Sequence, residues 1–363
     1  MDRFYLKRQK LFDLFDYINE EYLLYVPIRV EGRMLRCDYG LTLSCQDYTL
    51  KSYPLVKRAE VVYNSYRTTE PIKLFLIHPR EKVFVYFQKE DLVSENKKVA
   101  IFGVKNCDLF SLKIQDFMFL EGTDIDSVYK ERRENLLIIS SDCLSFKEVC
   151  FCSVYGINPY PEEDFDLNFS LVDEGFIVEA RSEKGRRILE SKGSYFEPAN
   201  RDQLREVSLK RERLIKELKE HLRSHQIPDK DILQEIIKNN YESNIWFEKV
   251  LNCVECGGCN FICPTCHCFL LSDERFGAVS RKIRIWDSCQ YANFAKVAGG
   301  ANPLNTRDKR LRNRFLKKFD FFKENLGIQG CSGCGRCIEV CLGKIDIREI
   351  LRELRMQNER LKV

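Results

Sequence analysis

The chain has 363 residues, of which 44% are hydrophobic and 31% are charged, and its formal net charge at pH 7 is +4. No apolar stretch approaches the roughly 20 residues that a helix needs to cross a bilayer, and so mild a net charge gives no general argument for nucleic-acid or lipid binding. The charged N-terminal stretch does not resemble a signal peptide, so we expect a cytoplasmic protein without a membrane span.

Cysteine is the unusual part of this composition. The chain contains seventeen cysteines. In a reducing compartment thiols stay available as thiolate ligands and disulfides are rare. The count therefore predicts metal binding.

The first two hundred residues show helix and strand patterns in turn. The charged, amphipathic start of the chain predicts a helix. Four β-branched or aromatic runs predict strands, and they begin at Leu24, Lys82, Lys97 and Asn135. Two short apolar runs joined by residues 173–175 predict a β-hairpin. We therefore expect an α/β domain over residues 1–205.

The middle of the chain is highly charged. Between residues 206 and 250, apolar residues such as Leu214, Leu218 and Leu222 recur at helical spacing. This spacing predicts a helical connector of one or two helices. After residue 251 cysteines dominate, and a last helical pattern begins at Ile347.

Two cysteine runs with the same spacing lie in this last part. The run from Cys253 to Cys263 reads C-x2-C-x2-C-x3-C and is followed by Pro264, and the run from Cys331 to Cys341 repeats the spacing without the proline. Bacterial ferredoxins use this run, with three cysteines on one [4Fe-4S] cluster and the fourth on a neighbouring cluster. Zinc sites also use C-x2-C pairs, but they do not need a third cysteine at the next step.

The ferredoxin pattern assigns ligands to two [4Fe-4S] clusters. The first thiol set is Cys253, Cys256, Cys259 and Cys341. The second thiol set is Cys331, Cys334, Cys337 and Cys263. We therefore predict an α+β protein with a bacterial-ferredoxin-like dicluster domain over residues 251–363 and an insertion between the two runs.

Four further cysteines form the N-terminal thiol set, Cys107, Cys143, Cys150 and Cys152. Cys107 and Cys143 each end an apolar run, and the other two follow shortly after the second run. If both runs are parallel strands, their ends meet at the carboxyl edge of a sheet, where α/β folds place their sites. We predict a third [4Fe-4S] cluster there, and the alternative is a group of buried free thiols.

Other cysteines have no assigned ligand role. Cys266, Cys268 and Cys289 flank the first run or follow a later apolar run, and cluster tuning, alternative ligation and packing all remain open for them. Cys37 and Cys45 are predicted to be structural.

Two charged features have more than one interpretation. The basic stretch of residues 306–318 predicts a helix that docks an acidic partner, raises the potential of a nearby cluster or is simply solvated. His221 and His225 are one helical turn apart, and a solvated helix face is favoured over a metal site.

The sequence lacks the common nucleotide-binding motifs. It contains neither G-x-G-x-x-G nor G-x-x-x-x-G-K-[ST], so it predicts no dinucleotide or P-loop site. A nucleic-acid enzyme needs a basic groove and usually a nucleotide motif, and a self-contained reductase needs its own substrate pocket. These absences argue against a nucleic-acid enzyme and against a self-contained reductase, so we do not expect nucleic-acid binding.

Between Val99 and Ile347 the chain resembles a known family. The stretches that carry the resemblance are FGVKNCDLFSLKIQDFMFL, VYKERREN, CFCSV, CGGCNFICPTCHCF, RIWDSCQYANFAKVAGG, RLRNRFLKK and GCSGCGRC. They resemble the iron–sulfur beta subunit of soluble, sulfhydrogenase-type [NiFe] hydrogenases. They are also similar to the iron–sulfur subunit of anaerobic sulfite reductase, which belongs to the same dicluster family. WDSCQ and the R-x-R-N-R stretch favour the hydrogenase branch.

The resemblance implies a non-catalytic electron-transfer subunit that acts as a relay between two kinds of partner. A flavin-bearing, diaphorase-type subunit handles NAD(P)H, this chain passes single electrons through its clusters, and a catalytic subunit reduces protons or another acceptor. The catalytic subunit implied is a [NiFe] hydrogenase or, in the alternative, a sirohaem sulfite reductase.

Overall fold

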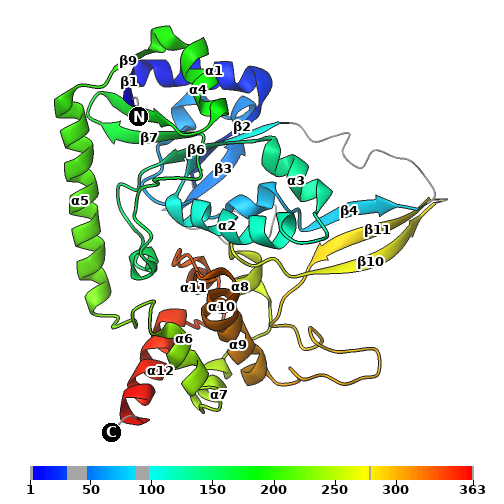
Figure 1. Cartoon of the computed structure of the whole chain (residues 1–363). Helices are drawn as coiled ribbons and strands as arrows, with labels where there is room; N and C mark the ends of the chain where they lie inside the picture. The colour runs from blue at the N-terminus through cyan, green and yellow to red at the C-terminus, as the bar shows by residue number, and fades with distance from the viewer. Residues whose placement is uncertain (1–2, 31–46, 87–97, 278, 362–363) are drawn as a thin grey trace. The chain divides into compact units, whose positions relative to one another are not determined.

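The computed structural model describes residues 3–30, 47–86, 98–277 and 279–361, with helices and strands mixed along the chain (Figure 1). The predicted α+β fold is confirmed. Cys37 and Cys45 lie outside the described residues. Within those ranges, no helix has both the length and the apolar content that a bilayer crossing requires.

The chain packs as two compact units that interleave in the sequence. The first comprises Met1–Ile77, Val93–Lys147 and Ile157–Leu218, and the second comprises His78–Leu92, Glu148–Gly156 and Lys219–Val363. The sequence predicts consecutive segments instead. The difference lies mainly in residues 78–86 and 148–156, which belong to the unit formed by the C-terminal part of the chain.

An eight-stranded sheet forms the centre of the first unit, in the order β3-β2-β5-β6-β7-β8-β1-β9. Its strands are β1 (Arg3–Lys7), β2 (Leu23–Arg29), β3 (Tyr48–Ser52), β5 (Val99–Val104), β6 (Leu136–Ser141), β7 (Leu167–Val172), β8 (Gly175–Ala180) and β9 (Phe196–Pro198). Strands β2, β5, β6 and β7 are parallel neighbours, and the other pairs are antiparallel. The strands predicted from Leu24, Lys97 and Asn135 and the predicted hairpin are thus confirmed.

The start of the chain differs from its prediction. Residues 3–7 form strand β1 rather than a helix, and helix α1 begins only at Leu11. Strand β1 pairs with β8 on one side and β9 on the other, and it buries Tyr5 and Leu6. The helical pattern is overridden because the backbone hydrogen bonds of two ladders and the burial of these side chains outweigh a local preference.

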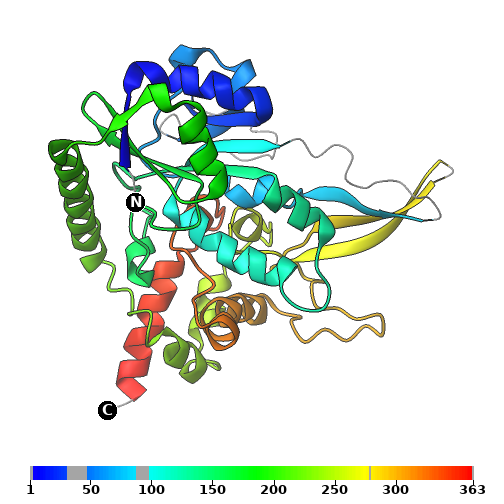
Figure 2. The same ribbon diagram turned by 45° about the horizontal axis from the view of Figure 1, so that its top comes forward.

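Helices cover both faces of this sheet. They are α1 (Leu11–Glu21), α2 (Asn106–Leu120), α3 (Ser127–Glu134), α4 (Glu183–Ser191) and the first part of α5 (Arg201–Arg223). Figures 1 and 2 show α1 and α4 on one face and α2 and α3 on the other. Phe15 of α1 packs against Phe102 of β5, with ring centroids 4.8 Å apart. Short 3₁₀ turns, Arg8–Lys10, Tyr53–Leu55, Arg58–Glu60, Ile72–Phe75 and Gly193–Tyr195, complete the unit.

The second unit combines a small sheet with short helices. Its antiparallel sheet has the order β10-β11-β4, from Phe269–Phe276, Val279–Trp286 and Arg80–Val85. The run at Lys82 is therefore a strand, as predicted, but it pairs with β11. The helices are α6 (Leu233–Asn239), α7 (Ile245–Val250), α8 (Gly258–Phe261), α9 (Arg307–Leu316), the π-helical turn η7 (Lys317–Phe321), α10 (Phe322–Leu326), α11 (Arg336–Glu339) and α12 (Ile347–Leu361), and a 3₁₀ turn spans Cys152–Tyr155.

Candidate iron–sulfur site

The two cysteine runs fold in the same way. Each passes through a glycine in the left-handed region, Gly257 with φ 71° and Gly335 with φ 73°, and then enters a one-turn helix, α8 or α11. The third cysteine of each run lies in that helix. An L-residue is strained at such a φ, so glycine is what lets the chain turn sharply between the second and third cysteines. The repeat in sequence is thus a repeat in local structure.

The first thiol set lines one cavity. Cys253, Cys256 and Cys259 come from the first run, and Cys341 comes from the end of the second. Much of the remaining wall is apolar and includes Leu311, Phe315, Ile345, Ile347 and Ile350. Burial raises the pKa of the Cys259 thiol to about 11, although Arg314 acts to lower it. A low-dielectric pocket of thiols suits a group that takes its ligands as thiolates and supplies the balancing positive charge.

In the second thiol set three cysteines are buried and Cys337 is half-buried. Burial raises the pKa of Cys331 to about 11, and the neighbouring thiols of Cys263 and Cys334 raise it further, while Lys318 opposes them. Burial also raises the pKa of Cys337, which is influenced by Cys331, Cys263 and Cys334 in turn. These influences indicate that the four thiols lie near one another. Like the first set, this donor set fits a metal cluster.

The insertion between the runs carries three buried cations. Arg310 and Arg314 lie on α9 and Lys318 on η7, at intervals of four residues, and each is at most 5% exposed. Arg310 is paired with Glu255, whereas Arg314 donates to the carbonyl of Cys259 at 3.1 Å and approaches the sulfur of Cys266 at 3.8 Å. The solvated-helix interpretation is therefore wrong for these three residues.

Lys318 makes the most direct of these contacts. Its ammonium nitrogen lies 3.4 Å from the sulfur of Cys263, 2.9 Å from the hydroxyl oxygen of Thr265 and 2.9 Å from the carbonyl oxygen of Gly330. Three donors and three partners hold the ammonium group in place.

Cys266 and Cys289 share a hydrogen-bond donor that sequence reasoning missed. The side-chain amide nitrogen of Asn260 lies 3.2 Å from the sulfur of Cys289 and 3.6 Å from that of Cys266. The Asn260 oxygen accepts from Ser288 at 3.0 Å, which fixes the direction of the amide. The amide nitrogen thus contacts both sulfurs. The sequence signal for this role is that a polar residue, Asn260, lies inside the first cysteine run.

Two members of the N-terminal thiol set lie in the first unit. Cys107 is in the first turn of α2 and Cys143 follows β6, and β5 and β6 are parallel as predicted. Between them lies Lys105, whose ammonium group donates to the Ser141 hydroxyl at 2.7 Å and to the Asp142 carbonyl at 2.8 Å. Burial lowers the pKa of Lys105 to about 8, and Cys143, Asp142 and Cys107 oppose that shift. The two thiols therefore share one polar neighbourhood.

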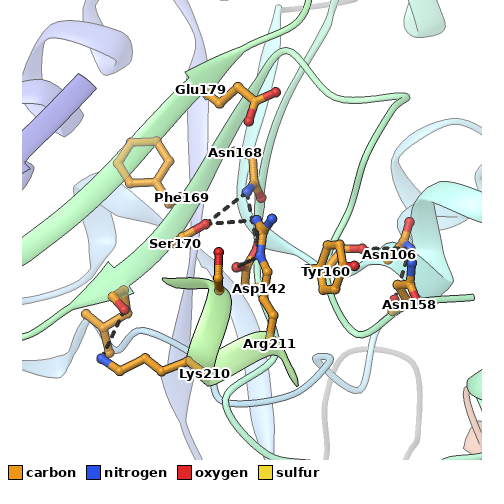
Figure 3. A network of polar contacts seen from close by, with 12 residues as sticks. Asn106, Asp142, Asn158, Tyr160, Asn168, Phe169, Ser170, Glu179, Lys210 and Arg211 are labelled. Carbon is orange, nitrogen blue, oxygen red and sulfur yellow. Dashed lines mark hydrogen bonds and ion pairs between the residues drawn. The ribbon is translucent and has the colours of Figure 1, made fainter. Parts of the chain in front are cut away.

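The residue before Cys143 is held by a network of side chains (Figure 3). Arg211 of α5 binds both carboxylate oxygens of Asp142, at 2.7 and 3.1 Å, and its guanidinium lies 4.2 Å from the centre of the Tyr160 ring. Asn168 donates to the same carboxylate at 3.1 Å. These contacts hold the end of β6, which Cys143 follows. The residues of the network lie far apart in the sequence, so no local pattern predicted it.

The other two members lie in the second unit, beside the second run. The backbone N–H of Phe151, between Cys150 and Cys152, donates to the carbonyl of Gly333 at 2.8 Å. A Cβ on Gly335 would lie 2.2 Å from the carbonyl oxygen of Val149, which only glycine avoids. The third cluster stays a prediction.

His221 and His225 do not form a solvated face. Both are half-buried; His221 lies 2.8 Å from the carbonyl oxygen of Glu148, and His225 lies 3.4 Å from the guanidinium of Arg348. Arg348 also pairs with the Glu148 carboxylate at 3.0 Å. This cluster ties residues 148–156 to α12 within the second unit.

Comparison with known proteins agrees with the thiol geometry. A family model described as a 4Fe-4S dicluster domain matches residues 252–345. Sulfhydrogenase 2 subunit beta of Pyrococcus furiosus is 32% identical over 292 residues, which cover 80% of this chain and 84% of that protein. The similarity therefore extends well beyond the dicluster domain. The chain belongs to the sulfhydrogenase beta-subunit family, and it is an iron–sulfur electron-transfer protein with a 4Fe-4S dicluster domain.

Proposed function

We propose that this chain relays single electrons between a flavin subunit that handles NAD(P)H and the catalytic subunit of a [NiFe] hydrogenase. The observation that carries the proposal is the adjacency of the two thiol sets. Cys337, a member of the second set, lines the cavity of the first set together with Cys341 from the end of the second run. Two redox centres held in this way are close neighbours, which is what a relay requires.

In this proposal each thiol set holds one [4Fe-4S] cluster, a group that gains and loses one electron. The protein's own residues hold the thiolates, exclude water through the apolar wall and direct N–H groups at sulfur. The N–H of Gly333 lies 3.5 Å from the sulfur of Cys331, and that of Ile345 lies 3.3 Å from the sulfur of Cys341. Such hydrogen bonds favour the more negative, reduced state.

A third cluster on the N-terminal thiol set is part of the proposal and rests on the sequence pattern. Its expected place in the relay is next to the flavin subunit. The relative from Pyrococcus furiosus is a subunit by name, and we propose that this chain also works within a multisubunit oxidoreductase.

Affinity purification of the chain from its native cells, without oxygen, tests the proposal. We expect a flavoprotein and a nickel-containing subunit to copurify, and NADPH to reduce a dye only when the flavoprotein is present. The isolated chain should be inert with NADPH and dye. A sirohaem protein in place of the nickel subunit would replace the hydrogenase assignment, and NADPH oxidation by the isolated chain would overturn the relay.

A further inference from the structure

Lys318 has an environment that a lysine seldom occupies. It is 4% exposed, and its ammonium group contacts a sulfur, a hydroxyl and a carbonyl oxygen. In the described part of the chain no carboxylate pairs with it; the nearby Asp320 is bound by Gln234 at 2.8 Å and Lys238 at 3.2 Å instead. A buried charge without a counter-charge is strongly unfavourable, so the balancing negative charge must lie next to Lys318.

The group that can supply this charge is the cluster proposed for the second thiol set. Lys318 touches Cys263, the member of that set that comes from the first run. An iron–sulfur cluster with four thiolates is anionic, and reduction adds one more negative charge. The inference rests on this part of the proposed function.

We propose that Lys318 is a positioning residue that raises the reduction potential of the cluster held by the second thiol set. Burial alone disfavours the reduced state, because the reduced cluster carries the larger charge. The ammonium group offsets that effect, since its attraction to the cluster is stronger in the reduced state and is little screened in a low-dielectric interior.

The neighbouring cations make the effect selective. Arg310 is neutralised by Glu255, and Arg314 contacts the backbone of Cys259 and the sulfur of Cys266. Among these three cations, only Lys318 donates to the sulfur of a proposed ligand. Its charge should therefore act mainly on one of the two clusters and set the order in which they are reduced.

The test is a redox titration of the whole protein, followed by paramagnetic resonance, with five proteins: the unmodified chain, Lys318→Gln, Lys318→Arg, Lys317→Gln and Cys334→Ser. Lys317 is the matched control because it is the adjacent lysine and its ammonium group lies over the ring of Phe294, at 4.8 Å. We expect Lys318→Gln to move one midpoint potential to a more negative value, namely that of the signal abolished by Cys334→Ser. Lys318→Arg and Lys317→Gln should keep both potentials close to those of the unmodified chain.

Each other outcome has a defined meaning. Loss of iron from the second set alone in Lys318→Gln, with full iron in Lys318→Arg, also supports the inference, because the charge is then needed to hold the cluster. Full iron with unshifted potentials in Lys318→Gln overturns it, as does iron loss in both Lys318 variants, which would indicate a role in shape. Absence of both signals from the unmodified protein would refute the proposed function itself.

Discussion

Cys256 and Cys334 occupy equivalent positions in their runs but different surroundings. Cys256 is exposed, whereas Cys334 is only 8% exposed. Solvent and small oxidants therefore reach the first thiol set more easily than the second. Two chemically identical cysteines thus differ because one run lies at the surface of its unit and the other lies under residues 148–156.

Substitution of these two cysteines separates the proposed clusters. Cys256→Ser and Cys334→Ser should each remove a different low-potential paramagnetic signal and about four iron per chain, because each deletes a ligand of a different set. Iron analysis and paramagnetic resonance measure this. Cys37→Ser is the control and should change neither quantity. A variant with full iron and both signals would show that its run is assigned wrongly.

The rate at which each thiol set loses iron should follow the solvent exposure of its cysteines. On treatment with a chelator and mild oxidant, we expect the signal that depends on Cys256 to decay several-fold faster than the signal that depends on Cys334, since attack requires access to the thiolate. The decay of each signal with time is the measurement. Equal rates, or earlier loss of the Cys334-dependent signal, would contradict the accessibility argument.

At the scale of elements, the second cysteine run depends on a partner segment distant in sequence. Residues 148–156 run beside Gly333 and Gly335 so closely that a methyl group at either position would overlap the backbone. These glycines therefore provide space as well as a sharp turn. The run is shaped by its neighbour, not by its own sequence alone.

The substitution Gly335→Ala tests this contact. The left-handed backbone alone should cost roughly 1–2 kcal/mol, and the overlap with Val149 should increase that cost. We expect a lower temperature of thermal unfolding and loss of iron from the second thiol set. Gly299→Ala serves as control because no atom lies within 4 Å of the added Cβ, and it should leave both measurements unchanged.

Local sequence patterns predicted where the strands lie better than they predicted which strands pair. The runs at Leu24, Lys97 and Asn135 were predictable as strands because a buried parallel strand is an uninterrupted apolar run. The run at Lys82 was equally predictable as a strand, but its pairing with β11 joins residues about 200 positions apart and leaves no local trace. The same holds for Lys318 and Asn260, whose roles depend on what the insertion folds against.

The dicluster domain was predictable because cluster geometry imposes fixed ligand spacing. The environment of each set was not, since it comes from α9, η7 and residues 148–156. At the scale of the whole molecule, the number of clusters and the direction of electron flow are established by chemical measurement on the intact protein.

The iron content of the whole protein distinguishes two clusters from three. Prepared without oxygen, the chain should contain about twelve iron and twelve sulfide if the N-terminal thiol set also holds a cluster. Close to eight of each would remove the third cluster and leave the dicluster domain intact. Stoichiometric zinc without sulfide would contradict the iron–sulfur assignment.

The N-terminal thiol set should also control coupling in the complete complex. Cys143→Ala is expected to stop electron flow between NAD(P)H and the catalytic subunit, while dye-linked activity of that subunit persists because dye enters after the break. Paired assays of both activities on one preparation measure this. Unchanged coupling with full iron would identify these cysteines as packing residues.

The interleaving of the two units has a consequence for how the protein is made. The second unit takes segments from early, middle and late parts of the chain, and Cys341, the last cysteine synthesised, completes the first thiol set. Domains fold as units during translation, N-terminal parts first. The sheet of the first unit has all its strands by residue 198, but residues 78–86 and 148–156 are made long before the C-terminal segments with which they pack. On the proposed ligand assignment, the first cluster can therefore be completed only after Cys341 has been synthesised.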